Sequence, residues 1–173
     1  MERNFVVRSA QPADSEAMAL VHVTSWRDTY RGTLVSDDVL DSPDLLESRE
    51  LFWIGALTDE RWANIRVAVA ERAGIIFGIA MSNPVEGEEW TWHLNVLYVA
   101  TEYHGTGAGA ALLNAVIDPA EPAALWVGDP VPRAQAFYRK SGFTPNGTVK
   151  IEDGIREIRM VRPASRPAPS GRG

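Results

Sequence analysis

A long apolar strand reaches an apolar helix through the stretch Leu97-Tyr98-Val99-Ala100-Thr101-Glu102-Tyr103-His104-Gly105-Thr106-Gly107-Ala108-Gly109. We call residues 104–109 the glycine loop. Because glycine has no Cβ, its backbone turns tightly and lets a ligand come close. The amides and the positive dipole end at a helix start favour a phosphate. The stretch therefore predicts a phosphate-binding loop, the alternative being a turn that only shapes the chain.

The spacing of the glycines separates this loop from other phosphate-binding loops. It matches neither the P-loop nor the Gly-x-Gly-x-x-Gly pattern of dinucleotide folds, and it lacks the Lys-Ser/Thr pair that holds a nucleotide with Mg²⁺. The sequence contains no cysteine. Disulfides, thiolate metal sites and a cysteine nucleophile are therefore excluded, and we expect no metal cofactor.

Helix and strand signals extend from the glycine loop in both directions. Alternating residues predict strands, and apolar residues three or four apart predict helices. The expected elements are strand 5–9, a helix from 12 or 14 to 31, a helical region 36–58 interrupted at 42–43, strands 65–71, 75–82 and 90–99, a helix from 107 to about 117, strand 123–128, a helix from 130 to 141, and strands 143–151 and 154–162. The order β-α-α-β-β-β-α-β-α-β-β predicts an α/β fold with a mixed central sheet.

Side-chain periodicity also predicts which faces are buried. The helix near 12–31 should turn a stripe toward the core, namely Ala13, Ala17, Leu20/Val21 and Thr24. Strict alternation in strand 90–99 separates two sets, namely Trp90, Trp92, Leu94, Val96 and Tyr98 on one face and Thr91, His93, Asn95, Leu97 and Val99 on the other.

Length and charge set the remaining expectations. The chain has 173 residues, which suits one domain, placed at 1–162, and the Pro/Gly/Ser-rich residues 163–173 are expected to form a disordered tail. The net charge of −6 argues against nucleic acid as a partner and weakly favours cationic molecules such as amines. We see no signal peptide and no stretch of membrane-spanning length, so we expect a cytoplasmic protein without a membrane partner.

Three segments share features with one known family. The first is Leu97-Tyr98-Val99 with the glycine loop and Leu112-Leu113, in which His104 stands where Arg or Gln is usual. The second is Ala134-Gln135-Ala136-Phe137-Tyr138-Arg139-Lys140-Ser141-Gly142-Phe143, preceded by Val131 where Asn is common. The third is Ser25-Trp26-Arg27-Asp28-Thr29-Tyr30-Arg31-Gly32. Over residues 5–162 the chain resembles the GNAT superfamily of acetyl-CoA-dependent N-acetyltransferases, and the third segment resembles a bacterial subgroup. A single GNAT-like domain is implied.

The resemblance implies where acetyl-CoA, the acetyl donor, would bind. The strand's backbone should pair with the pantetheine, and the loop amides should meet the pyrophosphate. The expected residues are Leu97, Tyr98, Val99, His104, Gly105, Thr106, Gly107, Ala108, Gly109 and Ala110. Tyr138 is expected to donate a proton to the departing CoA thiolate, the alternative being a tyrosine that packs beside Phe137.

Transfer to an amine also requires removal of a proton, since an ammonium has no lone pair. His93 stands where subgroup members often have Glu, and we expect it to act as the base. It would act directly or through a water held by Asn95, which we include among the catalytic residues. Glu88 and Glu89 are the alternatives.

The acceptor substrate is expected beside the first helix. His22, Trp26 and Tyr30 form a stripe that would wall its pocket, the alternative being core packing. The leading prediction is transfer of acetyl to a primary amine of a small molecule. Two alternatives stay open, an enzyme that acetylates proteins or peptides and a non-catalytic CoA-binding sensor. The family resemblance is compatible with a homodimer.

Overall fold

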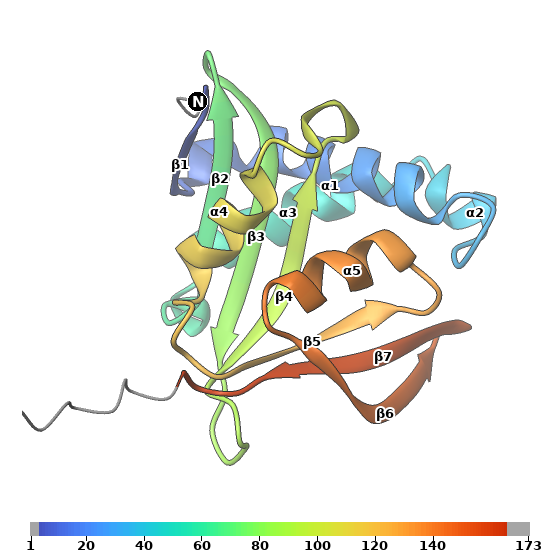
Figure 1. The fold of residues 1–173 in the computed structure, drawn as a ribbon. Coiled ribbons are helices and arrows are strands. Elements are labelled where there is room, and N and C mark those ends of the chain that lie inside the picture. Colours follow the sequence, from blue (N-terminus) through green and yellow to red (C-terminus); the bar gives the residue numbers. More distant parts are fainter. Residues whose placement is uncertain (1–3, 166–173) are drawn as a thin grey trace, which may run out of the picture.

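The computed structural model describes residues 4–165, which form one mixed sheet flanked by helices (Figure 1). The elements are β1 (Val6–Ser9), α1 (Ser15–Tyr30), α2 (Asp37–Leu40), α3 (Leu45–Thr58), β2 (Arg66–Arg72), β3 (Ile75–Pro84), β4 (Trp92–Val99), α4 (Ala108–Val116), β5 (Ala123–Gly128), α5 (Pro132–Lys140), β6 (Thr144–Glu152) and β7 (Ile155–Arg162). The seven strands are ordered β1-β2-β3-β4-β5-β7-β6. This arrangement confirms the predicted α/β class and element order.

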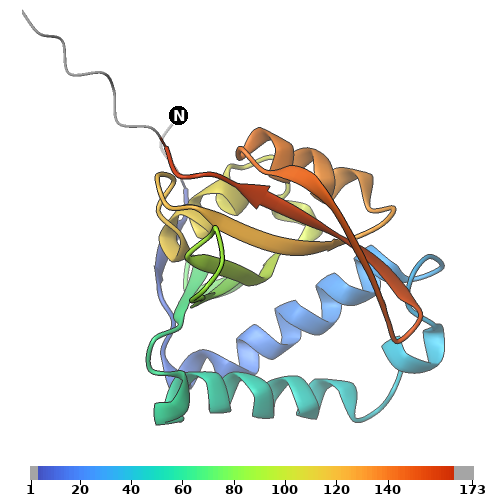
Figure 2. The same cartoon turned by 90° about the horizontal axis from the view of Figure 1, so that it is seen from below.

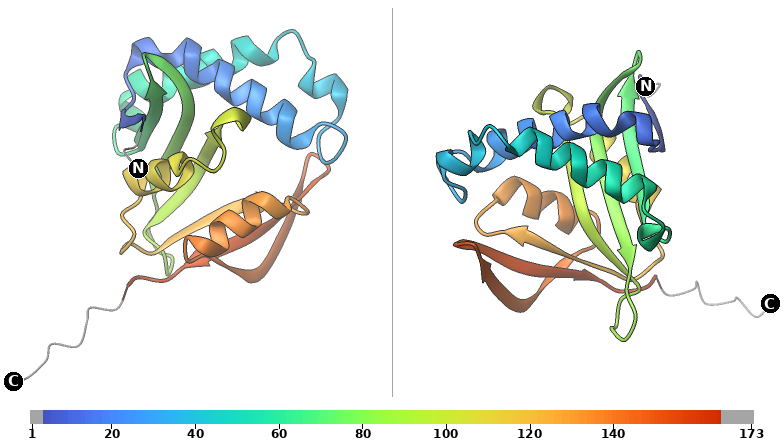
Figure 3. Two further views of the ribbon diagram at one scale, coloured as in Figure 1. Left: turned by 45° about the horizontal axis from the view of Figure 1, so that its top comes forward. Right: turned by 180° about the vertical axis from the view of Figure 1, so that it is seen from behind.

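Helices cover both faces of the sheet (Figures 2 and 3). Helices α1 and α3 lie on one face of the N-terminal strands, over a core that includes Met18, Trp53 and Ile79. Helices α4 and α5 lie on the other face, over a second core that includes Leu112 and Phe143. Burial of these apolar side chains is the main force holding the layers together.

The element boundaries differ in detail from the expectation. Three short 3₁₀ helices, which the sequence did not predict, occupy residues 12–14, 60–62 and 101–103. Helix α5 has Val131 as its N-cap and Pro132 in its first turn, rather than Asp129 and Pro130. The carboxylate of Asp129 does not cap the helix and instead accepts a hydrogen bond from Arg156.

The predicted core stripe of α1 is correct at Val21, which is buried, and wrong at most of its other positions. Leu20 is 58% exposed, and Thr24 is exposed as well. The buried residues of this helix are Ser15, Met18, Ala19, Val21, His22, Val23 and Ser25, a set that is largely displaced around the helix from the expected stripe. Small and β-branched residues occur on several sides of this helix, so apolar spacing alone did not identify the face that α3 and the sheet cover.

A β-bulge at Asn95 overturns the predicted faces of β4. Met81 pairs with Val96 and the next residue of β3, Ser82, pairs with Leu94, so Asn95 is an extra residue in β4. As a result Leu94 packs in the same core as Leu97 and Val99, with α4. Strict alternation fails at the bulge, and His93 does not share a face with Leu97. The strand also begins at Trp92 rather than at residue 90.

The bulge coincides with a separation of two strands. β4 pairs with β5 only through Trp92–Leu94, whose partners are Ala123–Leu125. Beyond these residues the strands diverge, as the ribbon shows between β4 and β5 (Figure 1). The edge of β4 from residue 95 to 99 is therefore left without a strand partner on that side.

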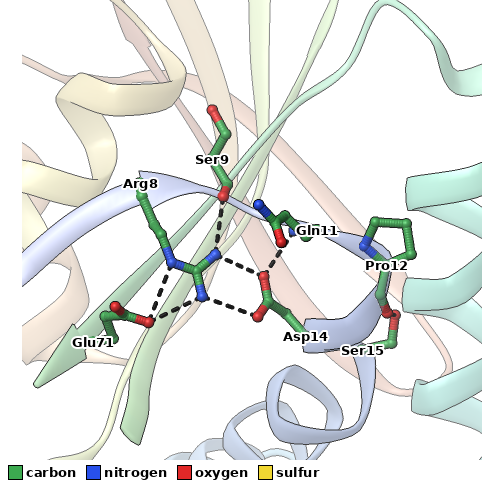
Figure 4. A network of polar contacts seen from close by, with 7 residues as sticks. All are labelled: Arg8, Ser9, Gln11, Pro12, Asp14, Ser15 and Glu71. Atoms are coloured by element: carbon green, nitrogen blue, oxygen red, sulfur yellow. Dashed lines mark hydrogen bonds and ion pairs between the residues drawn. The ribbon is translucent and has the colours of Figure 1, made fainter. Parts of the chain in front are cut away.

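Polar contacts of Arg8 fasten the N-terminal strand (Figure 4). Its guanidinium donates to Asp14 at 2.8 and 3.0 Å and to Glu71 of β2 at 2.9 and 3.2 Å. The Arg8 contact holds the pKa of Asp14 below its usual value. This network joins β1, β2 and the start of α1 on the side of the sheet remote from the divergence of β4 and β5.

The last described residues of the chain follow β7. β7 ends at Arg162, and the backbone amide of Ser165 still donates to Ala120. Residues 166–173, most of the expected tail, lie outside the described residues. In the part of the chain that the structure describes, no helix combines the length and the apolar character needed to cross a membrane.

Candidate active site

A cavity of about 570 Å³ occupies the space between the diverging strands β4 and β5. Its lining comes from β4, the glycine loop, the first turn of α4, the end of α1, β5 and α5. Of the predicted site residues, the lining includes Tyr30, Asn95, Leu97, Tyr98, Val99, His104, Gly105, Gly107, Ala108, Gly109, Ala110 and Tyr138. Thr106, His93, His22 and Trp26 do not line it.

The glycine loop adopts a conformation that needs glycine. Gly105 and Gly107 have φ values of 78° and 87°, in the left-handed region that side-chain-bearing residues rarely enter. A Cβ added at either position would meet no atom within 4 Å, so open space lies beside both. Gly109 has another role, since its Cβ would lie 3.3 Å from the Phe137 ring and it thereby lets α5 approach α4.

Backbone amides at the start of α4 are free to bind an anion. The first hydrogen bond of the helix runs from Ala111 to the carbonyl of Gly107, so the amides of Gly109 and Ala110 precede it. The Ala108 amide makes only a 3.4 Å contact with the Thr106 hydroxyl. Thr106 itself donates to the Tyr103 carbonyl at 2.7 Å and so holds the turn from outside the cavity.

The His104 side chain contacts the protein backbone. Its Nε2 lies 2.8 Å from the carbonyl oxygen of Val99, which makes Nε2 the donor. Its Nδ1 is buried and has no partner among the described residues. The ring thus holds the loop against the end of β4, and because His104 also lines the cavity, its role in binding the cofactor stays a prediction.

The free edge of β4 presents polar groups to the cavity. In an antiparallel ladder, alternate residues point their N–H and C=O groups to opposite sides. The Ala100 amide donates to Phe77 of β3, and the Val99 carbonyl instead points to His104. Leu97 and Val99 therefore direct their backbone groups away from β3, toward the gap that the cavity fills.

Three tyrosines meet at the inner end of the cavity. Tyr98 accepts a hydrogen bond of 2.8 Å from the Trp26 indole. Removal from water raises the pKa of Tyr98, and the adjacent Tyr30 raises it further. Removal from water also raises the pKa of Tyr138, with a smaller effect of Tyr30. Tyr138 therefore keeps its proton at neutral pH and can serve as a donor.

His93 lies next to the cavity, with Asn95 between them. The Asn95 amide nitrogen is 3.4 Å from Nδ1 of His93, a long contact, and Asn95 is on the lining. Burial lowers the pKa of His93 to about 4, and the charges of Arg159 and Lys150 add to this effect. The ring is therefore neutral at pH 7, and its link to the cavity runs through Asn95.

The predicted stripe on α1, formed by His22, Trp26 and Tyr30, lies partly in the core and partly at the cavity. His22 is 3% exposed and contacts the rings of Trp26, Phe52, Trp53 and Tyr98. Burial lowers the pKa of His22 to about 3, with a smaller effect of Arg49. This position corrects the expectation that His22 walls the acceptor pocket. Tyr30 does line the cavity, and Trp26 acts behind it through Tyr98.

Several residues of the lining were not predicted from the sequence, Trp126 and Arg133 among them. Trp126 belongs to β5, and Arg133 lies in the first turn of α5. The apolar alternation of Leu125-Trp126-Val127 marked the strand, but only the divergence from β4 shows that this part of β5 borders a cavity. The position of Arg133, directly after Pro132 at the start of a predicted helix, could have indicated a basic residue near the cavity.

Comparison with models of protein families identifies the family to which this chain belongs. The model described as an acetyltransferase (GNAT) domain matches residues 57–163. Because the match covers more than half of the 173 residues, the chain belongs to the GNAT acetyltransferase family. The match begins after Ser25–Gly32, so the bacterial subgroup stays a prediction.

Individual relatives agree with this family. An uncharacterized N-acetyltransferase of Mycobacterium tuberculosis is 40% identical over 97 residues, which cover 53% of this chain and 59% of that protein. The match thus spans less than two thirds of that relative's length. A probable N-acetyltransferase of the same organism is 27% identical over 175 residues, covering 97% of this chain and 98% of its own.

Solved structures share the fold. The PaiA N-acetyltransferase of Thermoplasma acidophilum, crystallised with coenzyme A, has a TM-score of 0.73 at 19% identity, over 92% of this chain and 98% of its own. The ribosomal-protein-S18-alanine N-acetyltransferase of Escherichia coli has a TM-score of 0.63 at 19% identity, over 98% and 99% of the two chains.

Proposed function

We propose that this protein transfers acetyl from acetyl-CoA to a primary amine, with a small molecule as the acceptor. The observation that carries the proposal is a single cavity in which the free edge of β4, the glycine loop and Tyr138 meet. Membership of the GNAT family supports the same chemistry. Acetyl-CoA is the donor substrate, and no metal is required for the step.

The residues present fit a CoA-like donor. The amides of Gly109 and Ala110, with open space beside Gly105 and Gly107, suit the pyrophosphate. Arg133 adds a positive charge to the same cavity. The free backbone groups of Leu97 and Val99 suit the amides of the pantetheine. Coenzyme A bound to the related fold of the Thermoplasma protein is consistent with this assignment.

The chain's own side chains would supply proton transfers. A neutral amine attacks the thioester carbonyl carbon, the C–N bond forms, and the C–S bond breaks. The Tyr138 hydroxyl, which is protonated at neutral pH, donates its proton to the departing thiolate. The amine loses its proton toward Asn95 and His93, through water held at the Asn95 amide.

The base assignment makes a pH prediction. Because the pKa of His93 lies at about 4, its contribution to kcat/KM should rise through pH 4 and be constant above about pH 5. We expect His93→Gln to lower kcat/KM by roughly tenfold to 10²-fold and to leave CoA affinity unchanged. Any rise near pH 7 to 9 should persist in the variant, since it belongs to the acceptor amine. A rise near pH 6.5 that vanishes in His93→Gln would contradict the low pKa.

The acceptor class is tested by direct comparison of substrates. Small primary amines and peptides with free N-termini are offered with acetyl-CoA, and kcat/KM is measured for each. We expect small amines to be preferred, since the aromatic residues Tyr30, Trp126 and Tyr138 all border the cavity. A clear preference for peptides would assign the protein to the other acceptor class, to which the ribosomal-protein enzyme of similar fold belongs by name.

A further inference from the structure

A second cluster of side chains lies on the face of β5 and β7 opposite α5. Trp126 of β5 pairs with Arg159 of β7, so their side chains share one face, and Glu157 precedes Arg159 by two residues on that face. His93 of β4 pairs with Ala124, which is two residues before Trp126 in β5, so the His93 side chain lies on the same face. In Figure 2 the face is turned toward the C-terminal end of α1 and is not overlaid by a helix.

Arg159 is held between aromatic rings. Its guanidinium carbon lies 4.4 Å from the centroid of the Trp126 ring and 5.1 Å from that of Trp90. These cation–π contacts fix the plane of the guanidinium and leave its N–H donors at the edge. Trp126 also lines the donor cavity, so Arg159, which is not itself on the lining, contacts a residue that is.

The charge of Arg159 has no acidic partner among residues 4–165. Its neighbour Lys150 is paired with Glu152 at 2.9 Å and Glu157 at 3.1 Å, and Arg156 on the same strand is paired with Asp129 at 3.0 Å. No ion pair of the described residues includes Arg159, and its buried Nε has no hydrogen-bond acceptor there. A partly buried cation without a partner costs free energy unless a ligand supplies the anion.

We infer that Arg159 binds a carboxylate of the acceptor, so that the acceptors are amines that also carry a carboxylate, such as amino acids. This inference rests on the proposed function and narrows it. A planar guanidinium matches a carboxylate with two parallel hydrogen bonds. The chain has a net charge of −6, which would repel the carboxylate of such an acceptor, and Arg159 provides the local attraction for it.

Matched acceptors test the inference. Each amino acid is compared with its carboxamide, which keeps the amine and removes the negative charge. Rates are expressed per neutral amine, since the two amines titrate differently. We expect the carboxylates to have kcat/KM at least about tenfold higher, as is typical of a hydrogen bond to a charged group. Arg159→Gln should abolish this preference, mainly through the acceptor KM, and leave acetyl-CoA affinity intact.

Two further variants separate binding from structure. Arg159→Lys keeps the charge but not the planar fork and should restore part of the preference. Arg156→Gln removes an arginine from the same strand whose partner is Asp129, and it should retain the full preference. Thermal melting confirms that each variant is folded. Equal rates for carboxylates and carboxamides, or equal effects of Arg159→Gln and Arg156→Gln, would overturn the inference.

A binding measurement distinguishes this inference from the transfer reaction itself. The protein saturated with CoA is titrated calorimetrically with the same amino acids and carboxamides. Tighter binding of carboxylates that is lost in Arg159→Gln supports the subsite even if no acceptor releases thiol, in which case only the proposed transfer fails. Equal binding of the two sets rejects the subsite whatever the turnover.

Discussion

Replacing Tyr138 by Phe is expected to lower kcat by about 10²–10⁴-fold, the usual contribution of a general acid. The change removes one hydroxyl and keeps the ring in contact with Phe137 and Phe143, which lie 5.3 and 6.0 Å away between ring centroids. The raised pKa keeps this hydroxyl protonated throughout the neutral range. Because a proton donor to the thiolate acts in the transition state, kcat should fall while the KM for acetyl-CoA changes little.

Tyr103→Phe is the matched control for this variant. Tyr103 also borders the cavity, but its ring stacks on Phe77 at 3.9 Å, and no proton transfer is assigned to it. Loss of the Tyr103 hydroxyl should lower kcat far less than loss of the Tyr138 hydroxyl. If Tyr138→Phe kept kcat within about a factor of two, well short of a general acid's usual contribution, Tyr138 would be a packing residue and the proton would come from elsewhere.

Replacing Gly107 by Val is expected to abolish measurable binding of CoA. Gly107 has φ 87° and is the N-cap of α4, so valine, which is branched at Cβ, would be strained there. The loop would shift, and the amides of Gly109 and Ala110 would lose their common direction. A side chain would also enter the open space that we assign to the pyrophosphate. Calorimetric titration with CoA measures the effect.

Gly74→Val provides the control for backbone strain. Gly74 has a similar φ of 78°, also has open space around its Cβ position, and lies in the turn between β2 and β3, outside the cavity lining. It should lower stability to a similar extent, by about 1–2 kcal/mol, and leave CoA binding unchanged. Equal CoA affinity in folded Gly107→Val and wild type would remove the glycine loop from the donor site.

The order of elements was predictable because its signals are local. The Asp153-Gly154 turn illustrates this, since both residues adopt positive φ, 50° and 78°, as a tight hairpin requires. The glycine loop was recognised for the same reason. Its two left-handed glycines and the helix start at Ala108 follow directly from residue type and position.

The bulge at Asn95 was not predictable, since an extra residue in a strand is defined by its partner. Only the pairing of Met81 with Val96 and of Ser82 with Leu94 reveals it. This single residue reverses the face of His93 relative to Leu97. The sequence therefore drew attention to His93, Asn95 and Leu97 but could not predict how these residues are placed relative to one another.

The surroundings of two histidines could not be predicted from the sequence, because imidazole serves many roles. His22 has the helical spacing of a pocket wall, yet α3 covers it with Phe52 and Trp53. His104 occupies a position where a cationic side chain is usual, yet its Nε2 is bound by the Val99 carbonyl. Both outcomes depend on neighbours that are distant in sequence or on ring orientation, which residue type does not determine.

Release of free thiol from acetyl-CoA, measured with and without a panel of primary amines, tests the central claim most directly. The account predicts thiol release that depends on both the protein and an amine, with one acetylated amine formed per thiol. Tight binding of CoA without amine-dependent release from any member of a broad panel of amines, amino acids and peptides would contradict it. That result would identify the cavity as the site of a CoA-binding sensor.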